Sequence, residues 1–178
     1  MINEVLLSLG SNIGDRMKYL REAADQINRF AEITQVASIY ETEPVSLIMQ
    51  DNYYNTAMII RTELDAENLM KRLLTVEKSL GRERTIAGNA RTIDLDIILF
   101  GDLIMDKPDV MIPHPRYTER KFVLIPSAEI AEHWICPIRH LTIQELLSLS
   151  RDTHRVQRVT SWYNFGTTIH NLPIGDAV

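Results

Sequence analysis

Apolar and polar positions follow two different periods along this chain, and these periods predict its secondary structure. Short apolar runs bounded by turn residues predict β-strands at residues 4–9, 33–40, 53–63 and 93–100. Apolar residues three or four positions apart predict two amphipathic helices, which begin after Asp15 and Asp65 and end near Phe30 and Leu80. A short strand near 103–105 and a helix at 143–149 are expected further along.

The predicted elements follow the order β-α-β-β-α-β, which is the split βαβ arrangement. We therefore expect an α+β fold with a ferredoxin-like core, in which a mainly antiparallel sheet carries helices mainly on one face, with further strands and helices appended. Residues 1–154 are expected to form a single domain. Residues 155–178 are too apolar for a solvated tail and are expected to pack on the body or on a partner.

Composition and charge restrict the classes of function. The 178 residues are 45% apolar and 24% charged, with a formal charge of −5, which argues against binding to nucleic acid or to an anionic membrane. Cys136 is the single cysteine, no apolar stretch is long enough to span a bilayer, and the N-terminal residues lack the pattern of a signal peptide. We therefore expect a cytoplasmic protein. As a separate expectation, we take the protein to act as a monomer.

Two aspartates at the start of the fourth main strand are the first candidate for chemistry. Side chains alternate along a strand, so Asp94 and Asp96 point to the same side, about 7 Å apart. Like charges this close are disfavoured unless a cation neutralises them, and carboxylate oxygens are ligands for magnesium. An isolated Asp-x-Asp pair is nevertheless more often only the solvated face of a sheet.

The loop before these aspartates favours the metal interpretation. Residues 81–91 contain three arginines and two glycines, namely Arg82, Arg84, Arg91, Gly81 and Gly88. Arginine binds phosphate oxygens with two parallel hydrogen bonds, and glycines allow a loop to close over a ligand. A basic loop beside an acidic strand predicts a nucleoside triphosphate site, although charged residues are also ordinary in solvated loops.

Other motifs are weaker on their own. The turn at 10–15 lies between a strand and a helix but lacks the pattern of a phosphate loop, so a tight turn with an Asp cap is favoured. The spacing of His133, Cys136 and His140 does not favour zinc. His114 lies between two prolines near Arg120, which indicates an anion-facing surface as readily as an ordinary loop. Tyr53 and Asn55 share one face of their strand, for recognition or for packing alone.

Taken in order, these pieces resemble the 6-hydroxymethyl-7,8-dihydropterin pyrophosphokinase family of folate biosynthesis. The matching segments are residues 9–16, 40–45, 53–55, 77–84, 91–101, 113–115 and 120–126. They extend over most of the chain, and the Arg-x-x-Asp-x-Asp block is highly specific. The resemblance implies an ATP-dependent diphosphotransferase that moves pyrophosphate from ATP to the hydroxymethyl group of the pterin and releases AMP.

The resemblance also implies roles for individual residues on the ATP side. Asp94 and Asp96 would bind two Mg²⁺ ions, and Asp94 would also contact the pterin. The residues implied to bind ATP are Arg82, Arg84, Arg91, Ile97, His114 and Arg120. The implied catalytic residues are Arg82, Arg91, Asp94 and Asp96.

On the pterin side, the resemblance implies a slot for a flat ring. Tyr53 and Phe122 would form its two faces and Asn55 would bind the edge of the ring, together with Thr42, Pro44 and Val45. Stacking on each aromatic face is worth about 1–3 kcal/mol.

The chain departs from its relatives at several positions. Gly88-Asn89-Ala90 stands where many relatives have Trp-Gly-Pro, and Ser46 replaces a common glycine. Asp109 and Met111 stand where some relatives have an arginine and a threonine, so those ATP contacts are not implied here. Two alternatives therefore stay open: a catalytically silent pterin- or nucleotide-binding protein, and another magnesium-dependent nucleotidyltransferase.

Overall fold

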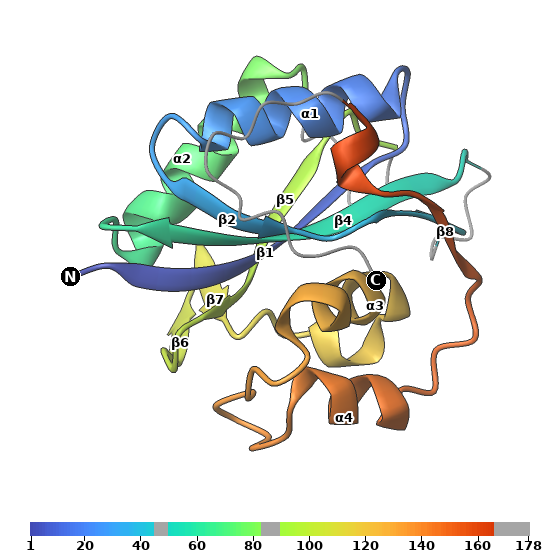
Figure 1. Ribbon diagram of the computed structural model, residues 1–178. Helices are drawn as coiled ribbons and strands as arrows, with labels where there is room; N and C mark the ends of the chain where they lie inside the picture. The colour runs from blue at the N-terminus through green and yellow to red at the C-terminus, as the bar shows by residue number, and fades with distance from the viewer. Residues whose placement is uncertain (45–49, 83–89, 166–178) are drawn as a thin grey trace.

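A central antiparallel sheet organises the protein, and the computed structural model describes residues 1–44, 50–82 and 90–165 (Figure 1). The sheet consists of β1 (Asn3–Ser11), β2 (Glu32–Val36), β3 (Ile39–Thr42), β4 (Tyr53–Thr62), β5 (Asp94–Phe100) and β8 (Val156–Thr160). The strand order is β5-β1-β4-β3-β8, with β2 also paired to β4, and each of these pairings is antiparallel.

Strands β2 and β3 together replace the single strand predicted at 33–40. Both pair with β4, β2 near its C-terminal end and β3 at its start. Ala37 and Ser38 interrupt the strand between them, although the Ala37 N–H still donates to the Ala57 carbonyl. When β2 and β3 are counted as one bent strand, the element order and the sheet order are those of a ferredoxin-like fold, as predicted.

Helices α1 (Arg16–Ile27) and α2 (Ala66–Ser79) cover one face of this sheet (Figure 1). Both begin at the predicted caps: Asp15 accepts a hydrogen bond from the Lys18 N–H at 3.0 Å, and Asp65 accepts one from the Asn68 N–H at 2.8 Å. Apolar side chains of the two helices pack against alternate residues of the strands, among them Leu7, Leu9, Leu20, Met58, Leu69 and Leu73. This layer is the larger hydrophobic core.

The opposite face carries α3 (Lys121–Ala131) and α4 (Ile143–Leu149), so the expectation of helices mainly on one face was wrong. Leu6 and Ile59 point to this side and pack with Leu124 and Leu146 in a second core. The apolar run at 122–125 belongs to α3, and such a continuous run shows no clear period from which its type could be predicted. The sheet therefore lies between two layers of helices.

The remaining elements lie around this framework. They are the hairpin β6 (Met105–Lys107) and β7 (Val110–Ile112) and the short helices η1 (Tyr117–Glu119) and η2 (Trp162–Phe165). The chain after α4 runs along the end of the sheet, adds β8 beside β3, and buries Trp162 in the larger core (Figure 1). Over the described residues, no helix is long and apolar enough to cross a membrane.

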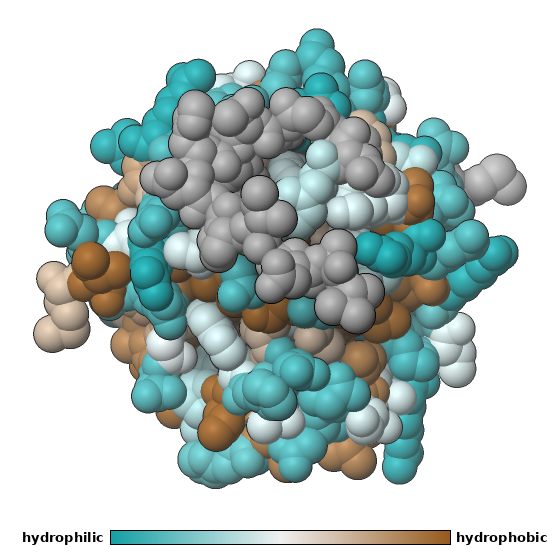
Figure 2. Space-filling model, viewed as in Figure 1, coloured by the Kyte–Doolittle hydropathy of each residue, from teal (hydrophilic) through white to brown (hydrophobic). Residues whose placement is uncertain are grey.

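The surface of the molecule is mixed in character. On the face shown in Figure 2, hydrophilic residues cover much of the outline and apolar residues are scattered between them. Such scattered apolar residues are normal for a protein surface, so hydropathy alone does not locate the functional site.

Candidate active site

Strand β5 places the two aspartates at the edge of the sheet. Asp94 and Asp96 are partly exposed, whereas Leu95 and Ile97 between and beyond them are buried in the larger core. This alternation arises because successive strand side chains point to opposite faces. The two carboxylates therefore lie on one side of β5, as the sequence predicts.

Arg82 and Arg91 converge on the first of these carboxylates. Arg82 Nη1 lies 2.5 Å from Asp94 Oδ1, and Arg91 Nη1 lies 2.5 Å from Asp94 Oδ2. One guanidinium therefore binds each oxygen of Asp94. A triphosphate, which offers several anionic oxygens, can take over these same donors because arginine binds phosphate in the same paired geometry.

Glu77 positions Arg82 through a buried ion pair, a role that was not predicted from the sequence. Its side chain is buried at the end of α2, forms an ion pair with Arg82, and accepts a hydrogen bond from the Leu95 N–H at 2.8 Å. It thus links α2, the start of the arginine loop and β5. The available signal was its position on the inner stripe of the helix, four residues after Leu73, where a carboxylate is unusual.

Asp96 lies in a strongly perturbed electrostatic environment. Desolvation, followed by the negative charges of Asp94 and Glu77, raises the pKa of Asp96 to about 7, against the opposing effect of Arg82. The side chain still keeps 38% of its surface accessible, so its oxygens can be reached. A cation bound between the aspartates would offset both causes of this raised pKa.

His114 and Arg120 border the aspartates on a second side. His114 Nε2 lies 4.0 Å from Asp96 Oδ2, and the His114 N–H donates to the Ile98 carbonyl of β5. Desolvation and the nearby Arg120 and Arg116 lower the pKa of His114 to about 4, so its imidazole is neutral at pH 7. A neutral ring of this kind can donate a hydrogen bond to a phosphate without adding charge.

Asn12 fixes the other end of the arginine loop. Its side-chain oxygen accepts from the Arg91 N–H at 2.7 Å, and its own N–H donates to the Arg91 carbonyl at 3.1 Å. Its side-chain nitrogen donates to Gln50 and to the Asp51 carbonyl. Gly10 and Ser11 extend β1, so the turn that was predicted at 10–15 is confined to residues 12–15 and ends at the Asp15 cap of α1. Asn12 is a second residue whose role was not predicted from the sequence.

The predicted pterin residues gather beside this cluster. Asn55 and Thr42 are buried, and Asn55 Nδ2 donates to Thr42 Oγ1 at 2.6 Å. Tyr53 pairs with Thr42 across the strands, and burial raises the pKa of its hydroxyl while the neighbouring Arg91 opposes this. Phe122 is partly buried in the first turn of α3, which packs on β3 and β4.

Gly10 permits the close approach of Asn55 to strand β1. A Cβ atom at Gly10 would lie 2.6 Å from Asn55 Oδ1, well inside van der Waals contact. We expect Gly10→Ala to lower the free energy of unfolding by about 1–3 kcal/mol, measured by urea denaturation. In the double variant Gly10→Ala/Asn55→Ala this loss should not add to that of Asn55→Ala alone, and full additivity would contradict a direct clash.

The other residues predicted for the site include a buried side chain, a partly exposed one and positions outside the described residues. Ile97 is 2% exposed with its side chain in the core, so an adenine contact there would have to use the backbone. Pro44 is described and partly exposed, whereas Val45 and Arg84 lie outside the described residues.

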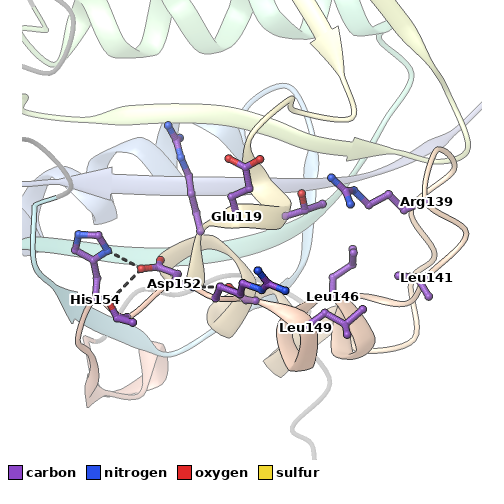
Figure 3. Close-up of a pocket in the computed structure, with 12 residues that line it drawn as sticks. Glu119, Arg139, Leu141, Leu146, Leu149, Asp152 and His154 are labelled. Carbon is purple, nitrogen blue, oxygen red and sulfur yellow. Dashed lines mark hydrogen bonds and ion pairs between the residues drawn. The ribbon is translucent and has the colours of Figure 1, made fainter.

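A separate cavity of about 540 Å³ opens between η1, α4 and residues 150–154 (Figure 3). Among the described residues predicted for the site, Arg120 is the one that lines it. Its wall combines leucines of the α4 region, including Leu141 and Leu146, with the linked pair Asp152 and His154. The cavity therefore adjoins the carboxylate–arginine cluster without containing it.

The carboxylates of the cluster offer few protein ligands for a metal ion. Within residues 1–44, 50–82 and 90–165 there is no group of three or more His, Cys, Asp or Glu side chains that could hold a metal ion. Magnesium bound with a nucleotide needs only one or two carboxylates, because phosphate oxygens and waters complete its octahedron. Asp94 and Asp96 fit that requirement.

The class of protein that fits both this fold and this cluster is an ATP-dependent transferase of phosphate groups. The family model of 7,8-dihydro-6-hydroxymethylpterin-pyrophosphokinase (HPPK) matches residues 6–132, and the chain belongs to this family. It is accordingly a pyrophosphokinase of folate biosynthesis that uses ATP as co-substrate.

Curated relatives agree with this assignment. The chain is 42% identical over 134 residues to the 2-amino-4-hydroxy-6-hydroxymethyldihydropteridine pyrophosphokinase of Bacillus subtilis, covering 74% of this chain and 80% of that one. It is 33% identical over 141 residues to the Aquifex aeolicus enzyme of the same name, covering 79% of this chain and 88% of that one.

Longer proteins also match. The folic acid synthesis protein FOL1 of Dictyostelium discoideum is 33% identical over 172 residues, which cover 96% of this chain but 24% of that protein. The crystal structure of wild-type Plasmodium falciparum HPPK-DHPS with pterin and p-hydroxybenzoate superposes with a TM-score of 0.67 at 15% identity, covering 83% of this chain and 42% of that one. The chain thus spans less than half of these two proteins, and the structural likeness shows the fold alone.

Proposed function

We propose that the protein carries out magnesium-dependent transfer of pyrophosphate from ATP to the hydroxymethyl group of 6-hydroxymethyl-7,8-dihydropterin, at the cluster around Asp94 and Asp96. The observation that carries this proposal is the convergence of Arg82 and Arg91 on Asp94, with Asp96 beside it. Arginine donors and carboxylate oxygens at one place are the two halves of a nucleoside triphosphate site.

Asp94 and Asp96 would hold two Mg²⁺ ions. When bound, the metal supplies neutralisation of the triphosphate charge and polarisation of the phosphorus that is attacked. The protein contributes carboxylates whose mutual repulsion and desolvation already favour a cation.

The arginines and His114 would bind the phosphates of ATP. Arg82 and Arg91 exchange their contacts with Asp94 for phosphate oxygens, so that these guanidiniums stabilise the negative charge during transfer. Arg120 and His114 approach from the other side of the aspartates. Arg84, on the same loop, is proposed to join them.

The pterin would lie between Tyr53 and Phe122. Asn55, held by Thr42, presents amide donors and acceptors to the edge of the ring, and the segment with Pro44 and Val45 contacts the rest of that edge. The hydroxymethyl oxygen then attacks the β-phosphorus in line and its proton is released to water. The bond between this phosphorus and the α,β-bridging oxygen breaks, and AMP leaves with the electron pair. Positioning and charge neutralisation carry the reaction.

The nucleotide that is released tests the proposal. The protein is incubated with ATP, Mg²⁺ and 6-hydroxymethyl-7,8-dihydropterin, and the products are separated by ion-exchange chromatography. Release of AMP with a diphosphorylated pterin is the expected result. Release of inorganic pyrophosphate would indicate nucleotidyl transfer, and binding without turnover would indicate a silent binding protein, so either outcome overturns the proposal.

We further propose that residues 1–154 form the catalytic domain and that residues 155–178 are an extension of it. The enzyme would act as a monomer in the cytoplasm. Light scattering coupled to size-exclusion chromatography is expected to give the mass of one chain. A concentration-independent mass of two chains would overturn the monomer.

A further inference from the structure

The segment that leads into β8 contacts both sides of the proposed pterin slot. We call residues 152–158 the strap. It runs from the side of α4 to the end of the sheet and pairs there with β3, Val156 opposite Thr42 and Arg158 opposite Tyr40 (Figure 1). It lies beyond residue 132, where the match to the family model ends.

The first contact of the strap is with the start of α3. Asp152 Oδ2 accepts a hydrogen bond from the Lys121 N–H at 2.9 Å, next to Phe122 in the same turn. The residue at the cap position of α3, Arg120, makes no side-chain capping bond, so Asp152 supplies an acceptor from outside the helix. This acceptor fixes the first turn of α3 to the strap.

Asp152 is itself held rigidly. Its side chain is 6% exposed, and its Oδ1 lies 2.5 Å from His154 Nδ1 and accepts from the His154 N–H at 2.9 Å (Figure 3). Burial acts to raise the pKa of Asp152, but the hydrogen bonds from His154 and Lys121 outweigh it and lower the pKa. The carboxylate therefore stays charged and correctly oriented at neutral pH.

The second contact of the strap reaches β3 and α3 together. Arg158 Nε donates to Ser38 Oγ at 2.8 Å, and Ser38 Oγ donates to Glu129 Oε1 of α3 at 2.6 Å. The Ser38 N–H and the Tyr40 hydroxyl donate to Glu129 Oε2 at 2.9 and 2.8 Å. One hydrogen-bond network thus connects β8, β3 and the helix that carries Phe122.

We propose that the strap is a positioning device for the pterin, which holds the helix of Phe122 at a fixed separation from the strand of Thr42. This inference rests on the proposed pterin slot. A flat ring binds between two walls only if their separation is held to about 0.5 Å, which requires a supporting shell of locked side chains. Asp152 and Arg158 supply that shell at two points, through the Lys121 N–H and the Ser38 hydroxyl.

The test compares two arginines of the same strap. Arg158→Ala removes the donor to Ser38, whereas Arg155→Ala removes a side chain that bonds only to Gln157 on the surface among the described residues. For Arg158→Ala we expect the KM for pterin to rise on the order of tenfold, with the KM for ATP and the kcat at saturating pterin little changed. Arg155→Ala should behave as the parent protein, and Arg158→Lys should recover part of the loss.

A second pair of variants tests the other contact. Asp152→Ala removes the acceptor for the Lys121 N–H, whereas Asp152→Asn keeps an oxygen there. We expect the alanine variant to weaken pterin binding on the order of tenfold and the asparagine variant much less, measured by calorimetry in the presence of a non-hydrolysable ATP analogue. Equal rises in the constants for ATP and pterin would indicate general loosening and would overturn the proposal.

Phe122→Ala separates failure of the strap from failure of the slot. If Phe122→Ala weakens pterin binding but Arg158→Ala and Asp152→Ala do not, the strap proposal fails and the slot stands. If Phe122→Ala leaves pterin binding unchanged, the slot assignment fails and the strap proposal fails with it.

Discussion

Replacement of Asp96 by alanine is expected to lower the rate of AMP release by at least about 100-fold, as for other single electrostatic groups at a reacting phosphate or carbonyl. Asp96 shares one side of β5 with Asp94, and its oxygens are accessible, so its loss removes half of the proposed metal ligands. The measurement is the steady-state release of AMP at saturating ATP, Mg²⁺ and pterin.

Asp96→Asn and Asp102→Ala are the matched variants for this experiment. Asparagine keeps the shape of the side chain but not its charge, so it should lose most of the activity as well. Asp102 is exposed in the turn just after β5, so Asp102→Ala should keep the parent rate. An Asp96→Asn protein with the parent rate would contradict the metal-ligand role.

Above neutral pH, the Asp96→Asn variant is expected to be at least as stable as the parent protein. The pKa of Asp96 is raised in the folded state, so the folded protein binds this proton more tightly than the unfolded chain. Stability therefore falls as the pH rises from about 4 to about 7, and the ionised carboxylate is a cost above that range. Asp96→Asn removes the cost, as is typical of residues retained for function rather than stability.

Local patterns in the sequence were sufficient for the main elements and for the carboxylate pair. The caps Asp15 and Asp65 act on amides three residues away, and the alternation around Asp94 and Asp96 is a property of the strand itself. The ferredoxin-like order followed from these elements. The residue-level roles at the site remain predictions.

Features set by distant contacts could not be predicted in this way. The break between β2 and β3 lies at Ser38, whose partner Glu129 is 91 residues away. Helix α3 begins in an apolar run without a clear period, which is compatible with a strand or a buried helix until Leu124 is seen to pack against the sheet. The position of Glu77 on the inner stripe of α2 is unusual for a carboxylate, but its role could not be predicted because its partner amide, at Leu95, is 18 residues further on.

Glu77→Ala is expected to cost about 3–5 kcal/mol of unfolding free energy, measured by urea denaturation. The Glu77 side chain is 2% exposed, and its carboxylate pairs with Arg82 and accepts from the Leu95 N–H. Its removal leaves a buried amide without this acceptor and leaves Arg82 dependent on Asp94, while alanine also leaves a cavity.

Glu67→Ala provides a control on the same helix. Glu67 forms an ion pair with Lys107 at 2.6 Å, but its side chain is 48% exposed, so its replacement should cost less than about 1 kcal/mol. Glu77→Gln should fall between the two, because its amide oxygen still accepts from Leu95 while the charge is lost. If Glu77→Ala were no more costly than Glu67→Ala, the link from α2 to β5 would not depend on this carboxylate. Arg82 would then have to be held beside Asp94 by the arginine loop alone.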